Sequence, residues 1–145
     1  MGLFTSFNIS ASGMTAQRLR SDTISANIAN VNTTNTGDGT PYVRKTVVFT
    51  EKGTSKFKDT LLTAQGYVGS GVKVSAIVND TETPMIKTYD PSHPDADENG
   101  YVSYPNVNVV TEMTNLIDAS RAYEANVTAF GASKAMAMKG LEIGK

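Results

Sequence analysis

The residues best suited to metal chemistry lie in one acidic loop in the second half of the chain. Four of them match positions 1, 3, 5 and 6 of the calcium-binding pattern D-x-D-x-N-G: Asp95, Asp97, Asn99 and Gly100. The pattern also requires a bidentate glutamate at position 12, where this chain has Asn106. Pro91 and Pro94 exclude the helix that would lead into such a loop. We therefore interpret the loop as a solvated turn, with no metal ligands.

The single histidine, His93, lies in the same loop between two prolines. Catalytic zinc sites use several histidines, and a serine nucleophile needs a motif such as G-x-S-x-G, which this chain lacks. The phosphate-binding patterns G-x-x-x-x-G-K-[ST] and G-x-G-x-x-G are also absent. The sequence predicts a protein that is not an enzyme, with no catalytic residue, cofactor or small-molecule substrate. A metal-dependent enzyme domain is the least favoured alternative.

Composition excludes further classes of function. The 145 residues carry a net charge of −1 and no basic cluster, which argues against nucleic-acid binding. The chain has no cysteine, so disulfides and thiolate metal sites are excluded. Apolar residues make up 39% and charged residues 19%, both below the averages of globular domains, so any core is modest.

Membrane association is not expected either. No run of 18 apolar residues exists to span a bilayer, and the first residues lack the charged and apolar blocks of a cleaved secretory signal. Met1, Gly2 and Ser6 match the loose N-myristoylation pattern. A single acyl chain needs a second anchor such as a polybasic patch, and only Arg18 and Arg20 lie nearby.

A long helix is predicted from Asn108, a suitable N-cap, to Ile143, with a length of about 54 Å. Its first stripe of apolar residues recurs in steps of three and four, close to the period of a coiled coil: Val109, Met113, Leu116, Tyr123, Val127, Phe130, Ala137 and Leu141. A second stripe, the alanine stripe, lies about 100° around the helix: Ala122, Ala125, Ala129, Ala132 and Met136. This helix is therefore expected to pack against two neighbours.

A first helix is predicted over residues 6–31, with the same three–four spacing but a poorer seam, since Gln17 and Ser21 occupy apolar positions. Gly13 and the many Ser, Thr and Asn residues lower its intrinsic helix propensity. Alone in water, this helix is expected to be marginal.

Residues 41–105 change to a β pattern. Strands are predicted in "PYVRKTVVF", "GVKVSAIVND", "PMIKTYD" and "YVSY", and residues 80–84 are expected to close a hairpin between the second and third. The domain prediction is an N-terminal helical arm (1–35), a small β-rich domain (36–105) with a flexible insertion near 53–70, and a C-terminal helix (106–145). The fold class is α+β, with the two terminal helices forming an antiparallel coiled-coil pair.

The segment "SGMTAQRLRSDTISANIANVNT", centred on Asn27-Ile28-Ala29-Asn30, resembles the N-terminal motif of bacterial flagellar basal-body rod proteins. Ser21 departs from the bulky apolar residue expected there. The stretch from Tyr89 to Val127 looks like the proximal-rod members of that family, called rod protein C, and "PYVRKTVVF" and "GVKV" also fit. The likeness covers most of the chain except about 53–70.

The resemblance implies a structural subunit of the flagellar rod in the basal body, the driveshaft that transmits motor torque across the cell envelope. It implies export by the flagellar type III apparatus without a cleaved signal, and assembly with copies of itself and other rod proteins. In the family, the terminal helices form the inner coiled-coil tube and the β segment lies outside.

We expect the termini to be largely unstructured in the exported chain and to fold on assembly. Both stripes and the N-terminal motif supply the predicted assembly interface: Met14, Ile24, Asn27, Ile28, Asn30, Val31, Met113, Leu116, Ala122, Tyr123, Ala125, Val127, Ala129, Phe130, Ala132, Met136 and Leu141. The alternative is a helical adaptor that binds another coiled coil without forming a filament.

Overall fold

The computed structural model describes residues 3–53 and 69–143. Its elements follow the order α1 (Leu3–Ala29), β1 (Lys45–Glu51), β2 (Val72–Asn79), β3 (Ile86–Tyr89), β4 (Tyr101–Tyr104) and α3 (Val109–Ile143). The predicted α+β class, with long helices at both ends and strands between them, is confirmed. The insertion predicted near 53–70 lies outside the described residues, apart from residues 53, 69 and 70.

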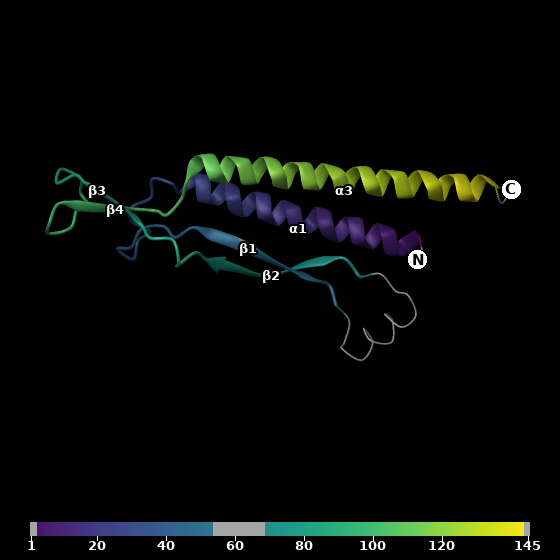
Figure 1. Cartoon of the computed structure of the whole chain (residues 1–145), viewed down its shortest axis with the longest axis horizontal. Coiled ribbons are helices and arrows are strands. Elements are labelled where there is room, and N and C mark those ends of the chain that lie inside the picture. Colours follow the sequence, from purple (N-terminus) through teal and green to yellow (C-terminus); the bar gives the residue numbers. More distant parts are fainter. Residues whose placement is uncertain (1–2, 54–68, 144–145) are drawn as a thin grey trace.

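The two helices lie side by side and antiparallel, and α1 forms the middle layer of an elongated molecule (Figure 1). Near one end, the rings of Phe7 and Phe130 are 4.8 Å apart. Near the other, Asn27 donates a hydrogen bond to Glu112. The β1–β2 hairpin contacts α1 on the side away from α3 (Figure 1). The helix expected to be marginal alone is thus covered on two sides.

Small and polar side chains fill the contact between the helices. Ser10, Ala119 and Ser133 are buried, as is Gly13. A Cβ atom built on Gly13 would lie 2.5 Å from Oδ1 and 2.8 Å from Cγ of Asn126. The absent side chain at Gly13 therefore lets the two backbones approach closely.

Gly13→Ala is expected to destabilise the chain by about 1–2 kcal/mol, because Asn126 must give up its position and its 2.7 Å hydrogen bond to the carbonyl of Ala122. Gly131→Ala is the matched control. Nothing lies within 4 Å of a Cβ at Gly131, so helix propensity should stabilise that variant by up to about 1 kcal/mol. Urea unfolding of both variants measures the difference. If both substitutions changed the free energy of unfolding in the same direction, Gly13 would not be required for the close approach of the two helices.

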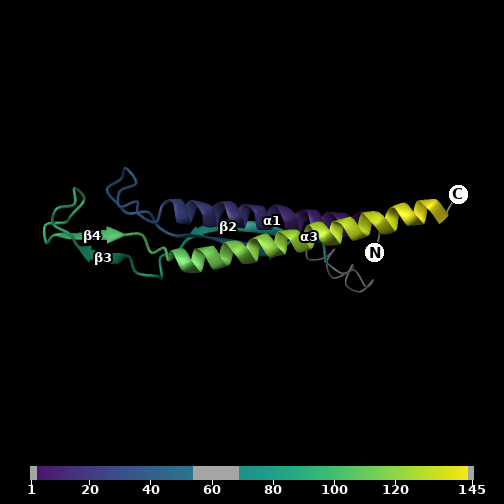
Figure 2. The same cartoon turned by 90° about the horizontal axis from the view of Figure 1, so that it is seen from above.

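The strands form two separate hairpins in place of one small sheet. β1 pairs antiparallel with β2, with Lys45 opposite Asn79 and a register shift between Val48 and Phe49. β3 pairs antiparallel with β4, with Ile86 opposite Tyr104. The second hairpin lies beyond the helix pair, at the end opposite the two termini (Figure 2).

The predicted hairpin between residues 71–80 and 84–90 is wrong. The carboxylate of Asp80 accepts hydrogen bonds from the backbone N–H groups of Glu82 and Thr83, and this turn directs the chain away from β2. In the next loop, Asp97 accepts from the N–H groups of Asn99 and Tyr101 and returns the chain onto β3. These side-chain bonds decide the pairing.

The start of α3 is as expected. Asn108 caps it, because its Oδ1 accepts the N–H of Thr111 at 3.1 Å. At the end of α1, the side chain of Asn30 donates to the carbonyl of Ala26 at 2.8 Å. In the described part of the chain, neither helix combines the length and the hydropathy that a membrane span requires.

Candidate assembly surface and its polar base

The apolar series of both helices meet along one side of the helix pair. Phe7 contacts Phe130, and heptad steps along antiparallel helices place the following residues opposite one another. We call this set the heptad ribbon: Phe7, Met14, Ser21 and Ile28 on α1, and Phe130, Tyr123, Leu116 and Val109 on α3. Six of the eight are half-buried, while Tyr123 and Val109 are 39% and 38% exposed. The ribbon therefore has its outer surface open.

The seam of α3 against α1 runs between the two predicted stripes and includes one residue of each, Ala137 and Ala122. Its buried and half-buried members are mostly small or polar: Glu112, Ala119, Ala122, Asn126, Ser133 and Ala137. The first stripe flanks this seam on one side, and the alanine stripe flanks it on the other. Ala125, Ala129 and Ala132 are exposed, as is Met136. Both stripes thus keep apolar surface uncovered within one chain.

The seventeen residues of the predicted interface divide into three groups. Ile24 and Asn27 are buried inside the chain. The half-buried residues are Met14, Ile28, Asn30, Val31, Leu116, Ala122 and Phe130. The exposed residues are Met113, Tyr123, Ala125, Val127, Ala129, Ala132, Met136 and Leu141. Only the last two groups have surface available to a neighbour in this conformation.

Beneath these surfaces, where the helix pair meets the β segment, lies a network that we call the polar base: Asn27, Tyr42, Arg44, Asp80, Asn106 and Glu112. Asn27 is its centre and is fully buried. Its amide nitrogen donates to the carbonyl of Lys45 at 2.8 Å and to Oε2 of Glu112 at 2.9 Å. Its oxygen accepts from the Tyr42 hydroxyl and the Lys45 N–H, both at 2.9 Å. One side chain thereby joins α1, β1 and α3.

Arg44 carries the charge of the polar base. Its Nη2 lies 2.7 Å from Oε1 of Glu112, whose side chain is 1% exposed, and its Nη1 lies 3.3 Å from Asp80. Burial by itself lowers the pKa of Arg44, but the bonds and charges of Glu112 and Asp80 outweigh it and raise that pKa. Burial, reinforced by the Glu112 charge, raises the pKa of Tyr42. The network therefore holds a charged guanidinium and a neutral phenol.

Asn106 connects the β3–β4 hairpin to the polar base. Its Oδ1 accepts the N–H of Arg44 at 2.9 Å, and its Nδ2 donates to the carbonyls of Asp80 and Thr83. Asn106 is 5% exposed. This residue, at position 12 of the calcium pattern, therefore orders the chain just before α3 and lies in the interior.

The carboxylates of the acidic loop hold turns together. Asp95 accepts from the hydroxyl of Thr34 at 2.7 Å, which is the leading cause of its lowered pKa. The N–H of Asp95 in turn donates to Nδ1 of His93 at 3.1 Å. Among the described residues, no three His, Asp or Glu side chains gather in a way that would hold a metal ion. The acidic loop is therefore held against residues 34–35 by hydrogen bonds.

Comparison with known proteins identifies the family of this chain. A family model described as "Flagella basal body rod protein" matches residues 7–35, and one described as "Flagellar basal body rod FlgEFG protein C-terminal" matches residues 98–143. The flagellar basal-body rod protein FlgC of Bacillus subtilis is 46% identical, with 100% of both chains covered. The chain belongs to the FlgC family of flagellar basal-body rod proteins.

Two further members of the FlgC family show how widely the match extends. The Borreliella burgdorferi protein is 46% identical over 99% of this chain and 98% of its own, and the Salmonella typhimurium protein is 37% identical over 100% of both. Both are flagellar basal-body rod proteins FlgC. The two family models cover α1 and α3, the elements that build the heptad ribbon. Membership of the FlgC family favours the rod hypothesis over a helical adaptor.

Sequence reasoning missed most of the polar base. The sequence places Asn27 in a motif and places Tyr42 and Arg44 in a predicted strand, whereas Glu112 falls within the predicted long helix without being singled out. A signal did exist, because an acid near a helix N-terminus is favourable and Glu112 occupies that turn. Nothing local indicated that its partner was Arg44, 68 residues earlier.

Proposed function

We propose that this chain is a non-catalytic structural subunit of the proximal flagellar rod, and that it assembles through its terminal helices into the axial driveshaft that transmits motor torque. The observation that carries the proposal is the open apolar surface on both flanks of α3, in a chain of the FlgC family. Large exposed apolar surfaces mark interaction sites. In rods, copies of this chain and other rod proteins would cover them.

The polar base gives the subunit a way to carry load. Torque applied to the helix pair must reach the β hairpins, and a two-stranded hairpin is marginally stable alone. Asn27 and Arg44 connect β1 directly to both helices. Glu112 binds to both of them from α3. The network has a buried centre at Asn27 and Glu112, and a bonded network of this kind has one preferred geometry, so it would resist rotation of the hairpins about the helices.

Coupled folding and assembly would suit export through the flagellar type III apparatus. The seam between α1 and α3 contains small and polar groups, so the helix pair gains little from its own apolar burial. Before assembly, the described parts of the two helices that lie beyond the polar base would open readily. In rods, neighbours would cover the heptad ribbon and the alanine stripe and so provide the missing stabilisation.

Amide hydrogen exchange tests the proposal on the purified chain and on isolated basal bodies. We expect amides of residues 114–143 to exchange at least about tenfold faster in the purified chain than in basal bodies, because local opening is cheap there. Amides paired between β1 and β2 serve as the internal control and should change little. A purified chain with fully protected helices, or a discrete complex of fixed size in place of an axial polymer, would overturn the proposal.

A further inference from the structure

The outer edge of β1, the edge that faces away from β2, presents unpaired backbone groups. In an antiparallel ladder, alternate residues turn their N–H and C=O groups toward the partner strand and away from it. Arg44 faces β2, because its carbonyl accepts the N–H of Asp80 at 2.8 Å. Lys45 and Val47 therefore turn their backbone groups to the outer edge.

Asn27 occupies the first position of this outer edge. Its side-chain amide donates to the carbonyl of Lys45 at 2.8 Å and accepts the N–H of Lys45 at 2.9 Å. These are the two bonds that a neighbouring antiparallel strand would make with that residue. In the described part of the chain, no group bonds to the N–H or C=O of the next outward residue, Val47.

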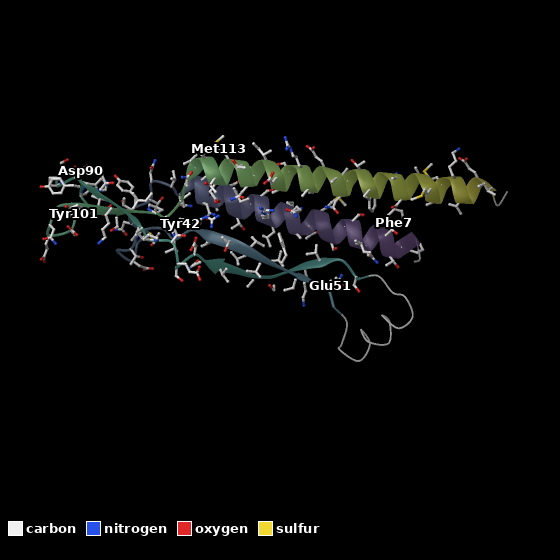
Figure 3. All side chains as sticks on the ribbon, in the orientation of Figure 1. Phe7, Tyr42, Glu51, Asp90, Tyr101 and Met113 are labelled. Carbon is white, nitrogen blue, oxygen red and sulfur yellow. The ribbon has the colours of Figure 1, made fainter. Side chains whose placement is uncertain are left out.

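A cleft of about 320 Å³ lies beside the unpaired part of the edge. We call it the edge cleft, and its walls from α1, β1 and α3 include Arg20, Ile24, Val47, Phe49 and Asn115. In Figure 3, β1 runs between the labelled residues Tyr42 and Glu51. An unpaired edge beside a cleft can take a further strand, whose backbone bonds to the edge while its side chains enter the cleft.

The charge of the edge cleft favours a carboxylate on the added strand. Arg44 and Glu112 both line the cleft and neutralise each other at 2.7 Å. Arg20 and Lys45 also line it, and neither forms an ion pair with any described residue. The cleft thus carries two positive charges without acidic partners, and the guanidinium of Arg20 is suited to bind a carboxylate.

The strands of this chain are poorly suited to supply that carboxylate. The four strands of the described chain carry Lys45, Lys73 and Lys87 but only one acid, Glu51, at the end of β1. A strand from a second copy would therefore bring mainly positive charge toward Arg20. The occupant that fits is an extended segment of a different protein.

We propose that the edge cleft binds an extended, acid-bearing segment of a different protein, which adds to β1 as a third strand and places an aspartate or glutamate on Arg20. The inference rests on the proposed function, because the partner is expected in the assembled basal body. It concerns a separate surface, since the heptad ribbon and the alanine stripe are suited to helices and the edge cleft to a strand.

Residue-resolved amide hydrogen exchange tests the strand addition on the purified chain and on isolated basal bodies. Val47 and Ile77 lie opposite each other in the β1–β2 ladder, so their N–H groups point to opposite edges. We expect the Val47 amide to exchange at least about tenfold more slowly in basal bodies than in the purified chain, and the Ile77 amide to change by less than about twofold. Equal rates for Val47 in the two samples would overturn the inference.

Photo-cross-linking in basal bodies identifies the occupant. We would place p-benzoyl-phenylalanine at position 49, where it keeps an aromatic ring in the edge cleft, and expect a cross-link to a different protein within a few residues of an Asp or Glu. Arg20→Glu should lower the yield at least about tenfold, because a hydrogen bond to a charged group is lost. Arg18→Glu makes the same change at an exposed position of α1 and should leave the yield unchanged.

Equal yields from the two glutamate variants would overturn the inference. A cross-link to a second copy, or to a segment without Asp or Glu, would do the same. The presence of the unmodified chain in basal bodies is measured in parallel, and its absence would overturn the proposed function. A chain that is present with a freely exchanging Val47 amide would overturn only the edge-cleft inference, so the two failures are distinguishable.

Discussion

Replacing Arg44 with methionine is expected to lower the free energy of unfolding by about 3 kcal/mol, the cost of leaving a buried charge without its partner. Glu112 is 1% exposed and has two bonds from Arg44, at 2.7 and 3.0 Å. The bond from Asn27 that would remain does not neutralise the carboxylate. Since domains of this size are stable by roughly 5–15 kcal/mol, the loss is a large share.

Urea unfolding measures the change, with Glu112→Leu and the double variant completing a cycle. The double variant Arg44→Met/Glu112→Leu should recover most of the loss, because apolar replacement of both partners is often neutral. Asn27 keeps its bond to the carbonyl of Lys45 in that variant. A loss below about 1 kcal/mol in Arg44→Met would show that Glu112 is solvated, contrary to the structure.

Ala129→Glu should abolish incorporation into rods while leaving the isolated chain within about 0.5 kcal/mol of its original stability. Ala129 is exposed on the alanine stripe, so the substitution disturbs no contact within the chain. In the rod, a neighbouring helix packed on this stripe would bury the carboxylate in an apolar surface, at a cost of several kcal/mol. Swimming motility and the content of isolated basal bodies measure incorporation.

Thr128→Glu is the matched control for that experiment. It places the same carboxylate at another exposed position of α3, about 100° around the helix from Ala129 and outside both apolar stripes. We expect Thr128→Glu rods to form. Normal rods from Ala129→Glu would show that the alanine stripe faces solvent in the assembly.

The sequence predicted the elements that depend on local patterns. Helical periodicity located both helices to within a few residues, and Asn108 was a recognisable N-cap with its hydrogen bond at 3.1 Å. The pairing of the strands was harder to predict from the sequence. The third strand had two candidate partners, and the choice depended on turn-forming bonds of Asp80 and Asp97 that alternation does not encode.

The candidate site was predictable in its apolar part only. The spacing of Tyr123 and Phe130 marked a stripe, but it could not say whether α1 or another subunit would cover it. The actual seam depends on Gly13 and Asn126, whose types look unremarkable in isolation. The polar base could not be predicted for a related reason. Asn27 and Glu112 are 85 residues apart in the chain, and the local sequence around one gives no indication of the other.

That separation along the chain has a consequence in time. Asn27 belongs to an early segment and Glu112 to a late one, and Glu112 must be present before Asn27 and Arg44 have their shared partner. During synthesis or passage through a narrow channel, most of the polypeptide emerges before the centre of the molecule can close. The native fold therefore cannot be completed until the last third of the chain, which contains Glu112, is available. A fragment truncated before that point cannot form the same network.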